Sequence, residues 1–143
     1  MALISVTRLR VRSLRYLLPF LWHTYRVTRL AEHSPQFLGG RVLREARNTF
    51  WTVTAWADET AMRSFRQKGA HGLVMPKLLT WCDEAAYVHW SQNSQQLPDW
   101  QEAHRRLVKE GKLSKVYHPS PAHEAKHFPE PKPGRIERIL KSA

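Results

Sequence analysis

The chain has 143 residues, 42% of them hydrophobic and six of them tryptophan, which is enough for one hydrophobic core and argues against a second domain. Its 23 Lys and Arg against 12 Asp and Glu give a formal net charge of +11, so the surface should attract nucleic acid, an anionic membrane surface or acidic proteins. The positive charge is concentrated near the N-terminus, where six arginines precede the first acidic residue, Glu32. The single cysteine, Cys82, excludes an internal disulfide and fits a reducing compartment.

An apolar run at residues 17–22 lies between arginines and superficially resembles a targeting signal. The run is far shorter than the ~20 residues that a membrane-spanning helix needs, and polar residues interrupt it on both sides. We therefore expect a soluble, cytoplasmic protein without a transmembrane segment.

The polarity pattern predicts the elements of the first two-thirds of the chain. In chain order they are a strand at 2–11, a helix at 14–33, strands at 39–46 and 49–57, helices at 58–68 and 70–83, and a strand at 86–90. Strands are expected where polarity alternates, and helices where apolar residues recur at spacings of three and four. Pro19 should kink the first helix or mark its start, and Pro76 should split the last one.

The remaining third of the chain has a different composition. Asp99 and Glu102 have capping-box spacing and predict a short amphipathic helix up to Gly111. From residue 113 onward the chain is charged, poor in apolar residues and contains five of the nine prolines, so we expect an extended arm with a helical turn at most at 135–140. The expected divisions are a folded domain at 1–91, a loop and amphipathic helix at 92–112, and a basic, proline-rich tail at 113–143.

The expected order of elements, strand-helix-strand-strand-helix-strand, is that of the split β-α-β fold. This α+β order gives a four-stranded antiparallel sheet with both helices on one face. Both faces of the strand at 49–57 carry tryptophan or phenylalanine, so the helix-free face would expose a large apolar patch. A second copy of the chain is the simplest cover, and we therefore predict a homodimer.

A set of residues in the central part of the chain resembles the central signature of dimeric α+β barrel proteins. The set comprises Phe50, Trp51, Thr52, Val53, Thr54, Ala55, Trp56, Asp58, Glu59, Phe65, Gly69, Ala70, His71, Met75 and Trp81. The chain is most similar to a family of unknown function adjacent to the spheroidene monooxygenase-like and antibiotic-biosynthesis-monooxygenase proteins. The resemblance covers about residues 2–91.

The resemblance implies a ferredoxin-like protomer, a homodimer joined through its sheets, and a pocket between sheet and helices. Haem-degrading relatives carry a tryptophan followed at a fixed spacing by a histidine ligand, whereas the matching residues here are Phe65 and Met75. That departure disfavours haem, the one cofactor that the resemblance suggests, and the sequence itself requires none. Chemistry varies among such relatives, so the fold alone assigns no reaction.

His71 is the candidate catalytic residue because it follows a helix-ending glycine near the end of the aromatic strand, where an imidazole could shuttle a proton or ligate a metal or haem. The alternative is a structural histidine bonded to the backbone. Candidate substrate-binding residues could line a pocket for a flat ligand; they are Trp22, His23, Trp51, Trp56, Met75 and Trp81. The alternative for each aromatic residue is an ordinary place in the core.

Residues 123–127 match the helical zinc motif H-E-x-x-H. We expect no metal site there, because Pro121 and Pro129 leave barely two turns of helix and Lys126 would place a positive charge beside the metal. Basic residues also interleave with aromatic ones near the N-terminus, as in surfaces that bind nucleic acid. The chain has neither an RNP signature nor zinc-finger spacing, so nucleic-acid binding is disfavoured.

Two functional hypotheses follow. In the first, a dimeric α+β barrel binds an apolar or aromatic small molecule between sheet and helices, and could act on it as a monooxygenase-like enzyme. In the second, a non-catalytic interaction protein of the same fold uses its basic face and tail to dock an acidic partner or nucleic acid.

Overall fold

The computed structural model describes residues 2–67, 76–132 and 136–141. Its strands are β1 (Ala2–Val11), β2 (Phe37–Glu45), β3 (Thr49–Trp56), β4 (Cys82–Gln92), β5 (Lys112–Leu113) and β6 (Ile136–Leu140). Its helices are α1 (Leu14–Glu32), α2 (Glu59–Gln67), α4 (Trp100–Glu110) and α5 (Pro121–Glu124), and residues 76–81 are also helical. The expected β-α-β-β-α-β order is therefore confirmed for the first two-thirds of the chain.

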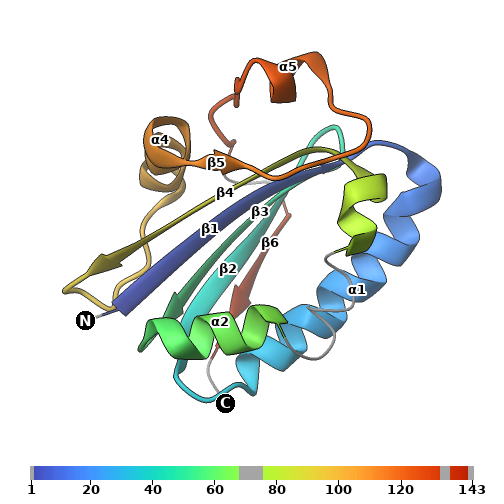
Figure 1. The fold of residues 1–143 in the computed structure, drawn as a ribbon. Helices are drawn as coiled ribbons and strands as arrows, with labels where there is room; N and C mark the ends of the chain where they lie inside the picture. The colour runs from blue at the N-terminus through green and yellow to red at the C-terminus, as the bar shows by residue number, and fades with distance from the viewer. Residues whose placement is uncertain (1, 68–75, 133–135, 142–143) are drawn as a thin grey trace.

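The strands form one antiparallel sheet in the order β5-β4-β1-β3-β2-β6 (Figure 1). The prediction of a four-stranded sheet is wrong, because β5 and β6 extend the four expected strands at the two edges. β6 pairs with β2 from Gly40 to Arg44 and uses the free backbone groups of that edge. Where a helical turn was expected at 135–140, residues 136–140 form a strand, whose last residue, Leu140, is buried.

Local signals explain where the early elements begin and turn. Arg47 and Asn48 both have positive φ angles of 61° and 57° at the β2–β3 turn, the conformation that hairpin turns favour and that asparagine tolerates. The Asp58 carboxylate accepts a hydrogen bond of 2.7 Å from the Ala61 amide at the start of α2. α1 continues through Pro19, which lies in its second turn.

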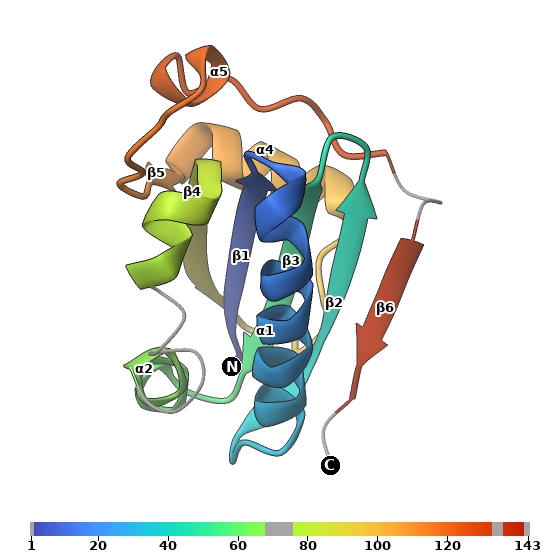
Figure 2. The same ribbon diagram turned by 90° about the vertical axis from the view of Figure 1, so that its right-hand side faces the viewer.

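The two faces of the sheet differ in chemistry because side chains alternate along each strand. On one face, β1 and β3 contribute mainly apolar side chains to a buried core, together with the buried Arg8; the apolar ones are Ala2, Ile4, Val6, Trp51, Val53 and Ala55. On the other face, which α1 and α2 cover (Figure 2), the same strands carry Ser5, Thr7, Thr52 and Thr54. The register places Ser5 opposite Thr54 and Thr7 opposite Thr52.

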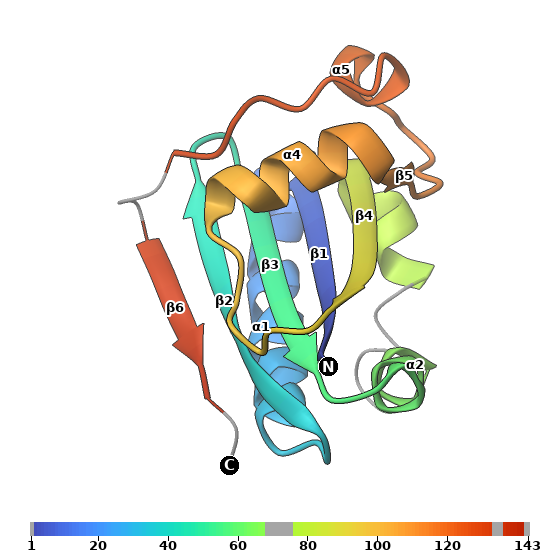
Figure 3. The same ribbon diagram turned by 90° about the vertical axis from the view of Figure 1, so that its left-hand side faces the viewer.

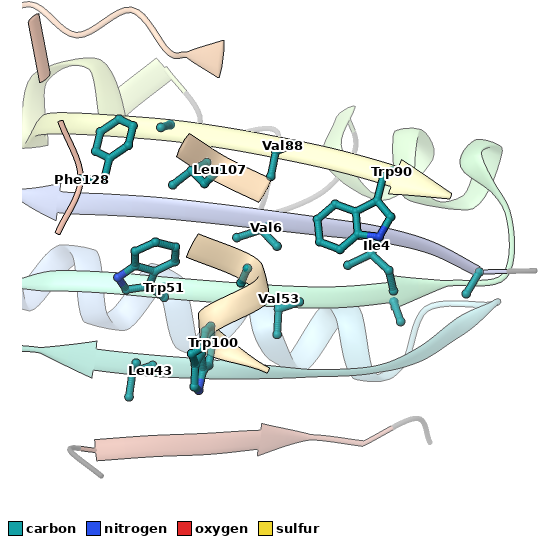
Figure 4. Close-up of a cluster of buried hydrophobic side chains, with 14 residues drawn as sticks. Ile4, Val6, Leu43, Trp51, Val53, Val88, Trp90, Trp100, Leu107 and Phe128 are labelled. Atoms are coloured by element: carbon teal, nitrogen blue, oxygen red, sulfur yellow. The ribbon is translucent and has the colours of Figure 1, made fainter. Parts of the chain in front are cut away.

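The apolar face is covered by the chain itself. α4 crosses it (Figure 3), and its residues Trp100, Ala103 and Leu107 are buried at the spacing that lines one side of a helix. In Figure 4, Trp100, Leu107 and Phe128 lie over the same face as Trp51. The expectation of an open face was wrong because it left α4 and the tail out of the core. The argument for a homodimer from an uncovered sheet therefore does not hold.

The C-terminal segment is tied to the sheet by a buried ionic network. Arg8 Nη1 lies 2.6 Å from Glu84 Oε1, and the Ser120 hydroxyl donates a hydrogen bond of 2.8 Å to Glu84 Oε2. The Arg8 guanidinium also lies over the Phe128 ring, 5.1 Å from its centroid. Burial opposes ionisation of Glu84, but the hydrogen bonds from Arg8 and Ser120 together with the positive charges of Arg8 and Arg10 outweigh it and lower the pKa of Glu84. The tail is thus a packed part of the fold rather than the extended arm expected from its composition.

The first histidine of the H-E-x-x-H match takes part in this packing. His123 is buried, and its Nδ1 accepts a hydrogen bond of 3.3 Å from the Ala85 amide. His127 is exposed and lies beyond the end of the four-residue helix α5. Among the described residues, no group of three or more His, Cys, Asp or Glu side chains is placed to hold a metal ion.

Candidate functional site

A cavity of about 130 Å³ lies between the hydroxyl-bearing face of the sheet and the helices α1 and α2. Most of its lining falls into three groups, which are the hydroxyl side chains of β1 and β3, a set of aromatic rings, and residues on the inner side of α1. The remaining lining residues are Leu9, Met62, Arg66, Leu78 and Leu140. This is the location that the sequence predicted for a pocket.

The floor of the cavity is formed by the hydroxyl side chains of two cross-strand pairs, Ser5 with Thr54 and Thr7 with Thr52. Thr54 Oγ1 accepts a hydrogen bond of 3.0 Å from Trp56 Nε1. The hydroxyls of the other three residues form no hydrogen bond within the described part of the chain, so they remain available as donors and acceptors for a bound molecule.

Aromatic rings form the two ends of the cavity. At one end Phe20 from α1 packs on Phe50 from β3, with ring centroids 4.7 Å apart. At the other end Trp56 from β3 packs on Phe65 from α2, with centroids 5.1 Å apart. Because these rings come from different elements, packing fixes them around a gap that a flat, apolar molecule could enter.

His23 is the titratable group on the α1 side of the cavity. Its ring lies 5.5 Å from that of Trp81, and its Nδ1 is buried without a hydrogen-bond partner among the described residues. Burial, followed by the positive charges of Lys77 and Arg26, lowers the pKa of His23. The imidazole is therefore neutral near neutral pH and can accept a proton or a hydrogen bond.

The residues predicted as a site are only partly brought together. His23 and Trp56 line the cavity, and Trp81 packs against His23. Trp51 lies on the opposite face of the sheet, in contact with α4, and Trp22 points outward from α1. The remaining two predicted site residues, His71 and Met75, lie outside the described residues.

Sequence reasoning missed the hydroxyl floor. Ser5 and Thr7 alternate with Ile4 and Val6 in β1, and this alternation by itself predicts a strand and not a site. The available signal was that Ser and Thr recur at alternate positions in both strands expected under the helices, where apolar side chains are usual for a packed core.

No protein-family model and no curated protein matches this sequence. Its structure, however, is similar to several solved structures. SnoaB from Streptomyces nogalater, described as a cofactor-independent oxygenase, is 18% identical, with 68% of this chain and 98% of that chain covered and a TM-score of 0.52. A putative antibiotic biosynthesis monooxygenase from Nitrosomonas europaea is 12% identical, with 64% and 90% covered and a TM-score of 0.54.

A conserved protein from Methanosarcina mazei Go1 is 14% identical, with 65% of this chain and 94% of that chain covered and a TM-score of 0.58. The chain thus has the same fold as these solved structures, which include proteins described as antibiotic biosynthesis monooxygenases. This confirms the resemblance inferred from the sequence. Nearly all of each neighbour is covered but only about two-thirds of this chain, so this chain carries an additional third.

Proposed function

We propose that this protein binds a small aromatic molecule bearing a hydroxyl group in the cavity between the sheet and the helices. The observation that carries the proposal is the hydroxyl floor beneath an aromatic enclosure, with the hydroxyls of Ser5, Thr7 and Thr52 unbonded within the described residues. A packed core would place apolar side chains there, because a polar group taken out of water without a partner costs stability.

The size of the cavity indicates the size of the ligand. An engineered cavity of about 150 Å³ in another protein holds one benzene ring, and the cavity here is about 130 Å³. It therefore suits a molecule with one aromatic ring. The flat faces of Trp56 and Phe50 would contact the ring, and the threonine hydroxyls would bond its polar substituent.

We further propose that the bound phenol undergoes a monooxygenase-like reaction with dioxygen as co-substrate, giving a quinone and water. The phenolic O–H bond and one ring C–H bond break, one oxygen atom enters the ring at that carbon and the other leaves as water, and the phenol itself supplies all the electrons that reduce dioxygen. Structural neighbours described as monooxygenases support this, as does a neutral imidazole at the cavity wall. His23 is the described residue that could accept a proton from a phenolic hydroxyl. His71 stays the residue proposed from the sequence for the same role, and alanine variants of the two would separate their contributions to dioxygen consumption.

Binding of p-cresol and of toluene tests the proposal, since the two differ by one hydroxyl group. We expect calorimetry to show that p-cresol binds more tightly, and that Thr52→Val weakens p-cresol about 2- to 12-fold, the range of one hydrogen bond, while leaving toluene unchanged. Valine keeps the shape of threonine, and Thr60→Val on the outer side of α2 is the control. Failure of both ligands to bind, or an equal effect of Thr52→Val on both, would contradict the proposal.

His23→Leu should separate function from stability. The buried Nδ1 lacks a partner in the described part of the chain, so leucine should leave the free energy of unfolding unchanged or raise it while p-cresol binding weakens. Because the pKa of His23 is lowered in the folded protein, its effect on stability is absent above pH 6.5 and becomes destabilising below it. Urea titrations above and below pH 6.5 should show that the His23→Leu variant lacks the loss of stability that His23 causes at the lower pH. A less stable variant with intact binding would show a structural histidine.

We also propose homodimerisation, because the resemblance of the central residues to dimeric α+β barrel proteins implies it. The sheet face first expected at the interface is occupied by α4, so a dimer of this chain would use another surface. Sedimentation of the full chain at micromolar concentration is the measurement, and a monomer would contradict the proposal.

A further inference from the structure

The outer side of α1 exposes a stripe of large apolar side chains. Leu14, Leu18, Trp22 and Tyr25 are 74%, 77%, 60% and 51% exposed. Their spacings of four, four and three residues place them on one side of the helix. Figure 2 shows that α1 lies across one face of the sheet, so these exposed side chains are on the side of the helix away from the sheet. Contiguous apolar patches of this kind mark interaction surfaces in proteins that are otherwise polar outside.

Before its last residue, α1 carries only positive charge. Arg15, Arg26 and Arg29 are exposed, and Glu32, the sole acidic residue of α1, is its last residue. Within the described residues Arg15 and Arg26 form no ion pair, and Arg29 lies 3.7 Å from Glu32. Three cations therefore flank the apolar stripe with little neutralisation, and they attract an anionic partner.

We infer that α1 docks the protein on an anionic lipid surface, with the helix lying parallel to the membrane plane. Exposed Leu and Trp beside Arg is the composition of helices that rest in the headgroup region, and each basic side chain near such a surface adds attraction. A fluid lipid layer accepts the convex side of a helix without a matching groove. No helix among the described residues is long and apolar enough to cross a membrane.

The charge pattern argues against a second copy of the chain as the occupant of this surface. In a symmetric dimer the same patch meets itself, so the three arginines of each copy would approach those of the other, with Glu32 as the single acidic residue of each α1. Docking through α1 does not depend on the ligand proposed above. The inner side of α1 lines the cavity, so docking would bring the cavity close to apolar compounds dissolved in the membrane.

Flotation with lipid vesicles tests the inference on the full chain. We expect binding to vesicles of equal parts phosphatidylcholine and phosphatidylglycerol, weakened by salt, and little binding to phosphatidylcholine alone. The triple variant Arg15→Gln, Arg26→Gln, Arg29→Gln should bind on the order of 100-fold more weakly, since each charge contributes about fivefold. The control with equal charge loss is Lys109→Gln, Lys112→Gln, Lys115→Gln, which changes exposed residues in and after α4.

The apolar part is tested by Leu18→Ser with Trp22→Ser, which should weaken binding at least about tenfold. Tyr117→Ser, an exposed aromatic residue distant in the sequence, is the matched control and should have no effect. Urea unfolding confirms that the variants fold, because every changed side chain is exposed. Equal binding by the variants and controls would overturn the inference. So would binding to polyglutamate without binding to anionic vesicles, an outcome that would favour an acidic protein partner.

Discussion

Replacing Trp100 by alanine is expected to lower the free energy of unfolding by about 3–5 kcal/mol, the cost of removing a large aromatic side chain from a packed core. Trp100 is only 4% exposed and packs edge-on against Trp51, with ring centroids 6.5 Å apart. The loss should be this large only if α4 covers the sheet, because a tryptophan on a loosely attached helix contributes little.

Trp22→Ala is the matched control, since it also removes a tryptophan from a helix but from one whose side chain is 60% exposed. It should change stability by no more than about 0.5 kcal/mol. Equilibrium unfolding in urea, followed by circular dichroism, measures both variants. Similar small effects of the two substitutions would show that the C-terminal third is not part of the core.

Glu84→Gln is expected to cost about 3–5 kcal/mol, because it leaves the buried guanidinium of Arg8 without its charged partner. The two side chains meet at 2.6 Å and are 5% and 6% exposed. Glutamine has nearly the volume of glutamate, so the loss would arise from charge rather than from a cavity. Urea unfolding at neutral pH is the measurement.

The control for the charge effect is Glu102→Gln. Its partner Arg105 is exposed, and exposed ion pairs contribute about 0–1 kcal/mol to stability.

Because the pKa of Glu84 is lowered in the folded protein, the stabilisation that Glu84 provides is present above pH 4.5 and is lost as the pH falls below that value. Glu84→Gln should therefore flatten the acid limb of the stability profile. A variant as acid-sensitive as the wild type would contradict the assignment.

The first two-thirds of the fold could be predicted because their signals are local. Polarity alternates along β1 and β3, Asp58 and Asp99 begin helices that they cap, and Arg47 with Asn48 fits a hairpin turn. Each of these signals lies within a few residues of the feature that it specifies. The resemblance to dimeric α+β barrel proteins rested on the same segment.

The C-terminal third could not be predicted because its partners are distant in sequence. Leu140 pairs with Gly40, and Phe128 reaches the core formed around Trp51. An edge strand needs few apolar residues when its backbone bonds to a neighbour, so a charged, proline-containing composition did not exclude one. The sequence therefore indicated an arm where the structure has a covering layer.

One error in the candidate site could have been avoided from the sequence. Trp51 and Trp56 are five positions apart in one strand, so their side chains point to opposite faces. The structure has Trp56 at the cavity and Trp51 under α4. The alternation of side chains along β3 therefore excludes one pocket lined by both tryptophans.

The central claim is that the cavity between sheet and helices binds a small phenolic molecule, and methyl NMR spectra recorded during a titration with p-cresol test it most directly. We expect the methyl signals of Val27, Met62 and Thr52, which line the cavity, to shift in a saturable way. The signals of Val6, Val53 and Val88, in the core on the opposite face, should stay in place. Shifts confined to the second group, or none up to the solubility limit of p-cresol, would contradict the claim.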